Sequence, residues 1–164
     1  MSTKALVSLG VAAAVALAGV SAEAANTSSS FTTQITITSS CTILGTAALN
    51  FGNQGVIGII VPATSTLQVQ CTNSTPYNIG LDAGTGLGAT PPARIMTAGL
   101  ATVVYSIYSD SAHTTVWGNT IGTNTVSAVG NGASQSYTLY GLVPVQVTPV
   151  AGTYTDTITV NVTY

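Results

Sequence analysis

Apolar and polar residues alternate with a period of two in several short stretches of the chain. The clearest is residues 31–38 (FTTQITIT), where Phe31, Thr33, Ile35 and Ile37 fall on one side. Such alternation predicts β-strands with one face toward a core. The same pattern recurs at residues 67–71, 77–81, 103–108, 136–140 and 155–164.

Glycine- and proline-rich breaks separate these stretches. Examples are Gly84-Thr85-Gly86, Thr90-Pro91-Pro92 and Gly130-Asn131-Gly132. Beyond the first two dozen residues, no long stretch repeats apolar residues at the three-and-four spacing of a helix, and β-branched residues dominate. Many short strands in one domain predict an all-β, two-sheet sandwich with Greek-key crossings.

Residues 1–24 have the pattern of an export signal. Lys4 supplies a positive charge, residues 5–20 are apolar, and Ala22-Glu23-Ala24 fits the small-x-small cleavage rule. A transmembrane anchor is the alternative, but the apolar run is shorter than the roughly 20 residues that cross a bilayer. We therefore expect cleavage after Ala24, which leaves residues 25–164 as a single secreted domain without membrane insertion.

Loss of the signal leaves very few charged residues. Arg94, Asp82, Asp110 and Asp156 remain, with no lysine and no glutamate. One arginine cannot supply the clustered positive charge that nucleic acids or anionic membranes require. The surface must instead be rich in Thr, Ser, Asn, Gln and Gly, which offers little charge repulsion between copies and favours assembly.

Two cysteines, Cys41 and Cys71, are present in the chain. In an exported protein an isolated pair predicts one disulfide. A metal site is the alternative, but two thiols without nearby His or Cys partners do not fill a tetrahedral shell. We therefore expect a disulfide, no metal and no cofactor.

Groups able to perform acid–base chemistry are scarce. Ser106, Asp110 and His113 lie close in sequence, but a catalytic triad is defined by geometry and the nucleophile-elbow context is absent. Asp110 and His113 are better explained by a hairpin loop, where Asp and Ser favour turns. Paired carboxylates and phosphate-binding loops are also lacking, so we expect no enzymatic activity.

An ordered series of short motifs extends over the whole chain beyond the signal. It resembles the spore coat protein U domain, a family that includes pilins of the archaic chaperone–usher pathway. Each motif is short, and the resemblance rests on their order and on the placement of both cysteines. The motifs are Ser39-Ser40-Cys41-Thr42-Ile43, Leu49-Asn50-Phe51-Gly52, Val69-Gln70-Cys71, Tyr77-Asn78-Ile79-Gly80-Leu81-Asp82, Arg94-Ile95-Met96, Tyr105-Ser106-Ile107-Tyr108-Ser109-Asp110, Trp117-Gly118, Tyr137-Thr138-Leu139-Tyr140-Gly141 and Gly152-Thr153-Tyr154-Thr155-Asp156-Thr157.

This resemblance implies a fold and a mode of assembly. Such pilin domains are immunoglobulin-like sandwiches that lack the final strand and so carry an open apolar groove. A periplasmic chaperone fills the groove, and an outer-membrane usher exchanges it for the N-terminal extension of the next subunit. The resemblance thus implies a shaft subunit of a bacterial surface fibre, with roles in adhesion and biofilm formation. Its parts would be a signal (1–24), a donor-strand extension (25–40) and a pilin domain (41–164).

Two segments would carry this assembly. The donor strand would present Phe31, Thr33, Ile35 and Ile37, although the polar Thr33 leaves its register open; an ordinary first strand of the same domain is the alternative. The C-terminal strand would border the groove and face the chaperone; a plain core strand is the alternative. Its apolar face comprises Ile158, Val160, Val162 and Tyr164.

A second function remains open from the sequence. A monomeric secreted coat protein or a carbohydrate-binding module could share this fold. Binding modules often present clustered aromatic side chains, whereas Trp117 stands alone and the tyrosines are spread among the strands. Tip adhesins of such fibres have two domains, so the single domain here favours a shaft subunit.

Overall fold

The computed structural model describes residue 19 and residues 23–164. The predicted signal peptide falls almost entirely outside these residues, including Lys4 and Ala22, so it stays a prediction. Among the described residues, no helix is long and apolar enough to cross a membrane. The chain divides into two units, residues 1–35 and 36–164. In the first unit, residues 23–35 form neither helix nor strand.

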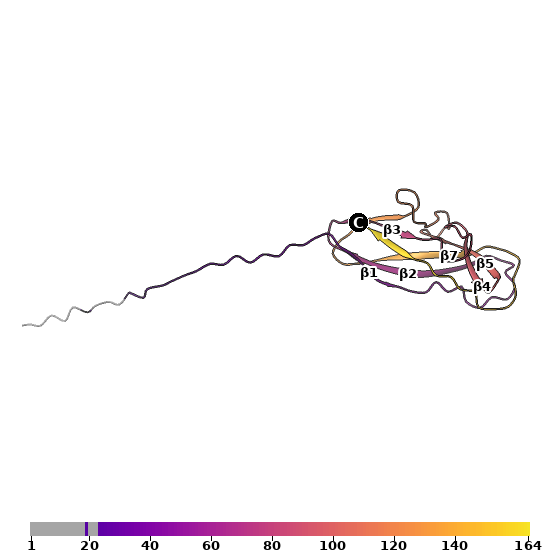
Figure 1. The fold of residues 1–164 in the computed structure, drawn as a ribbon, viewed down its shortest axis with the longest axis horizontal. Helices are drawn as coiled ribbons and strands as arrows, with labels where there is room; N and C mark the ends of the chain where they lie inside the picture. Colours follow the sequence, from indigo (N-terminus) through magenta and orange to yellow (C-terminus); the bar gives the residue numbers. More distant parts are fainter. Residues whose placement is uncertain (1–18, 20–22) are drawn as a thin grey trace, which may run out of the picture. The chain divides into compact units, whose positions relative to one another are not determined.

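The second unit consists of β-strands joined by turns and loops (Figure 1), and no helix occurs among the described residues. The all-β prediction is confirmed. Within residues 36–164 the strands are β1 (Cys41–Thr46), β2 (Val61–Cys71), β3 (Pro76–Leu81), β4 (Arg94–Ala98), β5 (Ala101–Tyr108), β6 (Val126–Val129), β7 (Ser134–Val143) and β8 (Val160–Thr163).

The strands form two sheets, one in the order β1-β2-β7-β5-β4 and the other in the order β6-β3-β8. Every pairing between these strands is antiparallel. The pairs β2–β7 and β3–β8 join strands far apart in sequence, which is the predicted Greek-key type of crossing. As a result, β1 ends one sheet and β8 ends the other, and each has a strand neighbour on one side only.

The core lies between the sheets and follows from the alternation in the sequence. Leu67 and Val69 of β2 are fully buried, as are Ile79 and Leu81 of β3. Trp117 is buried with them, and its indole Nε1 donates a hydrogen bond to the carbonyl of Ile79 (2.9 Å). A buried indole needs such a partner, so the lone tryptophan acts here as a core residue.

Four of the six predicted strands lie within β2, β3, β5 and β7. The prediction for residues 155–164 is only half right, because β8 begins at Val160. Its neighbour β3 ends at Leu81, the partner of Val160, so residues 155–159 extend past the end of the neighbouring strand. Residues 31–38 belong to no strand, which argues against an ordinary first strand of the same domain.

Arg94, the only arginine, is completely buried. Its guanidinium donates to four main-chain carbonyls: Nε to Asp82 (2.9 Å), Nη1 to Pro91 (2.8 Å), and Nη2 to Leu81 (3.2 Å) and Trp117 (2.7 Å). Burial lowers the pKa of this guanidinium, but arginine stays protonated in proteins. Arg94 thus ties three separate loops and strand ends together from inside the sandwich.

The predicted disulfide is present. Cys41 and Cys71 are direct partners on β1 and β2, and their sulfurs are bonded. Next to them, Ser40 donates its amide to the Thr72 hydroxyl (3.0 Å), and the Thr72 amide donates to the Ser40 carbonyl (2.9 Å). The Thr72 hydroxyl also forms a hydrogen bond with that of Thr75 (2.6 Å). The chain is therefore fixed to the sandwich from Ser40 onward.

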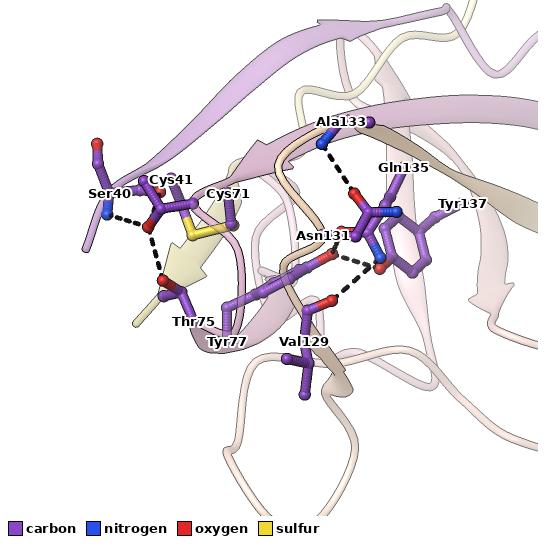
Figure 2. Close-up of a disulfide and its surroundings, with 11 residues drawn as sticks. Ser40, Cys41, Cys71, Thr75, Tyr77, Val129, Asn131, Ala133, Gln135 and Tyr137 are labelled. Atoms are coloured by element: carbon purple, nitrogen blue, oxygen red, sulfur yellow. Dashed lines mark hydrogen bonds between the residues drawn. A yellow bond between two sulfur atoms is a disulfide. The ribbon is translucent and has the colours of Figure 1, made fainter. Parts of the chain in front are cut away.

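A second polar cluster lies close to the disulfide (Figure 2). The hydroxyl of the buried Tyr77 shares a hydrogen bond with that of Tyr137 and donates to the Gln135 side chain (3.1 Å). Gln135 in turn donates to the carbonyl of Val129 (3.2 Å). These bonds connect both sheets at this end of the sandwich, which we call the disulfide end.

Removing the disulfide is expected to destabilise the domain strongly. The bond joins residues 30 positions apart, and closing such a loop restricts the unfolded chain by about 3.5 kcal/mol in the chain-entropy model. The Cys41→Ser/Cys71→Ser double variant should therefore unfold at a clearly lower urea concentration than the parent. Intact-mass measurement after alkylation gives the control: two reactive thiols in protein taken from the periplasm would contradict a native disulfide.

An open groove between the two sheets

The sandwich is open along one side, between the edge strands β1 and β8. The opening is a groove of about 1000 Å³. One wall is the segment that follows β1, residues 46–57, and the other is the segment that precedes β8, residues 148–160. Core side chains from three strands form its floor, namely Leu81, Val103, Tyr105, Ile107, Leu139 and Val143.

The first wall departs from its sheet directly after β1. The Ala47 amide still donates to the Thr66 carbonyl (2.9 Å), but residues 48–60 are in no strand. Phe51 packs edge-on against Tyr105, with ring centroids 5.9 Å apart. Gly141 of β7 permits this approach, because a Cβ there would lie 2.9 Å from the Phe51 ring. The wall therefore lies against the floor without pairing with it.

Main-chain and side-chain hydrogen bonds hold the second wall in place. Thr155 exchanges two main-chain hydrogen bonds with Thr97 of β4 (2.9 and 3.1 Å). The Asp156 carboxylate accepts from the Tyr105 hydroxyl (2.8 Å) and from the Thr85 amide (2.8 Å). Burial, and then the hydrogen bond to Asp156, raise the pKa of Tyr105 well above its ordinary value, so this phenol remains a neutral donor.

The floor and the edges of the groove differ in chemistry. The floor is apolar, and both flanking edge strands have unsatisfied sheet edges, which are templates for pairing with another chain. An extended segment with one apolar face would close the gap between the sheets and cover the apolar floor. Among the described residues, no group of three or more metal-ligating side chains occurs.

The sequence profile of the Spore Coat Protein U domain matches residues 27–161, most of the chain. The chain belongs to this family. The chain is 31% identical to Protein U of Myxococcus xanthus over 170 aligned residues, which cover 94% of each chain.

A solved structure gives the same fold. It is the chaperone–tip adhesion subunit (CsuC–CsuE) pre-assembly complex of the archaic chaperone–usher Csu pili of Acinetobacter baumannii, and one of its chains matches with a TM-score of 0.59 and 27% identity. The match covers 79% of this chain but 40% of the Csu chain, so the present protein spans less than half of that relative.

In this spore coat protein U domain, the predicted C-terminal site residues divide into two groups. Ile158 and Val160 line the groove. Val162 packs against the core beyond the groove, and Tyr164 is 59% exposed at the disulfide end. The apolar face that the sequence assigned to one strand is therefore shared between the groove wall and β8.

The predicted donor residues are all exposed. Phe31 is 88% and Ile35 82% exposed in the first unit, and Thr33 between them is also exposed. Ile37, in the second unit, is 72% exposed and borders a shallow hollow that includes Ser40. These large apolar side chains have no packing partner among the described residues.

The apparent triad is not assembled. The Ser106 hydroxyl donates to the Pro92 carbonyl (2.6 Å), and the Asp110 carboxylate accepts from the Thr114 (3.1 Å) and Thr115 (2.6 Å) amides. Among the described residues, no hydrogen bond joins the side chains of Ser106, Asp110 and His113; the His113 amide donates to the Asp110 carbonyl (3.1 Å), as in a turn. The Asp110 loop is a turn, as expected from its composition.

Sequence reasoning missed most of the groove. Neither wall, residues 47–57 or 148–157, has a regular period, and both depend on contacts with distant strands. A usable signal was the run from Val143 to Val150 (VPVQVTPV), where apolar residues persist although prolines at 144 and 149 disfavour a central strand.

Proposed function

We propose that this protein is a structural subunit of a bacterial surface fibre, assembled by a chaperone and an usher through donor-strand complementation. The observation that carries the proposal is the open groove between edge strands β1 and β8, whose floor is made of core side chains. A folded domain with such a defect needs a complementing strand.

Residues 25–38 supply a segment of suitable chemistry. They contain no charged residue, and Phe31, Ile35 and Ile37 recur on one side of an extended chain. Fourteen extended residues span roughly 46 Å, more than a sandwich strand of the length of β2 or β7. The C-terminal residues Ile158 and Val160 would border the inserted strand, and the chaperone would contact them first.

The partners and location follow from the same scheme. The predicted signal would deliver the chain to the periplasm, where a chaperone fills the groove until an outer-membrane usher passes the subunit to copies of itself or related pilins. The Csu complex supports a chaperone partner, because it is a pre-assembly complex of a chaperone with a tip adhesion subunit. We propose that the subunit belongs to the shaft, and adhesion and biofilm formation would be functions of the fibre. We infer no catalytic role.

The proposal predicts that the subunit alone is poorly stable. Expressed in the periplasm without a partner, it should be degraded, aggregate or polymerise with itself, because an open apolar groove and two unpaired sheet edges invite pairing with other chains. Co-expression with its chaperone should raise the soluble yield severalfold. A long-lived monomer with a cooperative unfolding transition at high temperature would contradict the proposal.

One observation favours the alternative of a monomeric coat or carbohydrate-binding module. Tyr108 and Tyr140 are cross-strand partners on β5 and β7, and the His113 ring lies edge-on to both, at 5.3 and 6.3 Å between centroids. The tyrosines are thus less scattered than the sequence indicated. If Tyr108→Ala/Tyr140→Ala abolished surface attachment while fibres were absent from the parent cells, this alternative would replace the fibre.

A further inference from the structure

One end of the sandwich carries a large exposed apolar surface. Two loops form it, residues 55–60 before β2 and residues 144–150 after β7. They adjoin each other, since the Ile57 amide donates to the Thr148 hydroxyl (2.8 Å) and the Gln146 amide to the Ile57 carbonyl (3.5 Å). Six aliphatic side chains, 57–93% exposed, make up what we call the apolar end patch: Val56, Ile59, Ile60, Val145, Val147 and Val150.

This patch continues the groove. Ile57, Thr148 and Val150 belong to the patch loops and also line the groove. Neither loop contains a charged residue. A contiguous apolar surface without charges is the usual mark of an interaction site, and its continuity with the groove indicates that the same partner covers both.

The direction of an inserted strand decides which part of that partner arrives at the patch. β1 and β8 run in opposite directions, so a strand inserted between them is antiparallel to one and parallel to the other. We take it to be antiparallel to β8, whose alternation continues into the groove wall at Ile158. β8 runs from Val160 toward the disulfide end, where Thr163 pairs with Asn78 of β3. The inserted strand therefore leaves the groove at the opposite end, beside the patch.

The donor's own domain must follow within a short distance. The Ser40 amide donates to the Thr72 hydroxyl, and the Ser40 carbonyl accepts from the Thr72 amide. Only residues 38 and 39 separate Ser40 from Ile37. Three residue steps span about 10 Å. The disulfide end of the donor is therefore brought against the patch of the acceptor.

We propose that the apolar end patch docks on the disulfide end of a second copy of this chain, as a contact additional to the inserted strand. The disulfide end offers matching apolar side chains, Val129 (56% exposed) and Tyr164 (59% exposed). Two different surfaces meet, so the contact is head-to-tail. It can repeat from one subunit to the next along an open fibre. The proposal rests on the donor-strand function.

Cross-linking of assembled fibres tests the contact. The full chain carries Val147→Cys and Val129→Cys, and fibres are treated with a short bismaleimide before boiling in SDS with reductant. We expect a ladder of covalent multimers. The matched control is Leu87→Cys with Val129→Cys, since Leu87 is 98% exposed outside the patch; it should give monomer, as should each single-cysteine variant.

The same samples, run without cross-linker and without boiling, report donor-strand assembly separately. A ladder in unboiled samples without a cross-linked ladder overturns the end contact and leaves the proposed function standing. An equal cross-linked ladder with Leu87→Cys also overturns it, because contact would not be specific to the patch. Absence of both ladders overturns the proposed function and the contact together.

Discussion

Ile35→Asp is expected to abolish fibre formation. If residues 25–38 insert into a neighbour's groove, the Ile35 side chain moves from 82% exposure into an apolar core, which contributes about 1.5–3 kcal/mol. Aspartate would lose that contribution and would carry an unpaired carboxylate into the groove, at a further cost of several kcal/mol. Electron microscopy of cells and unboiled gels should show a loss of at least a hundredfold in multimers.

Gln34→Asp is the matched control. It adds the same charge one residue away, but neighbouring residues of a strand face opposite sides, so this carboxylate should stay in water. Fibre yield should be nearly unchanged. Equal polymerisation of the two variants would remove the donor-strand assignment, and loss with Gln34→Asp alone would shift the register by one residue.

Arg94→Met should prevent the domain from folding. Methionine keeps much of the aliphatic volume of arginine but removes the donors to four carbonyls, those of Leu81, Asp82, Pro91 and Trp117. Each buried carbonyl left without a partner costs about 1–3 kcal/mol. The summed loss approaches the whole stability of an ordinary domain.

The measurement is the yield of subunit co-expressed with its chaperone, together with circular dichroism of the purified protein. Asp110→Asn is a suitable control, because it also removes a charge but from an exposed turn. Arg94→Lys should fail almost as badly, since one ammonium group cannot reach carbonyls on three separate segments. Normal yield and spectrum for Arg94→Met would contradict the structural role of the buried guanidinium.

The strands were predictable where their pattern was local. Alternation located Leu67 to Cys71 and Tyr77 to Leu81, because each inward side chain meets the core of its own sheet. Likewise, the disulfide followed from two cysteines in a chain that begins with the pattern of an export signal. The resemblance to the spore coat protein U domain also survived comparison, since it depended on the order of motifs over the whole chain.

The groove was predictable only as a consequence of that resemblance. Residues 155–159 continue the alternation of β8 but lose their strand neighbour at Leu81, and no local pattern shows where a distant strand ends. The burial of Arg94 was also not predictable from the sequence. A lone arginine in a polar sequence suggests the surface, and its burial depends on carbonyls that the fold brings together from residues 81–82, 91 and 117.

Hydrogen–deuterium exchange with an added peptide tests the central claim most directly. The acceptor is the full mature chain with Ile35→Asp, which cannot donate its own strand, and the peptide is residues 25–38. We predict slower exchange in residues 46–51 and 155–160, on the two sides of the groove. An Ile35→Asp peptide should not slow exchange in either segment. The edge strand β6 serves as the internal control. Protection confined to β6, or equal protection by both peptides, would contradict donor-strand binding in the groove.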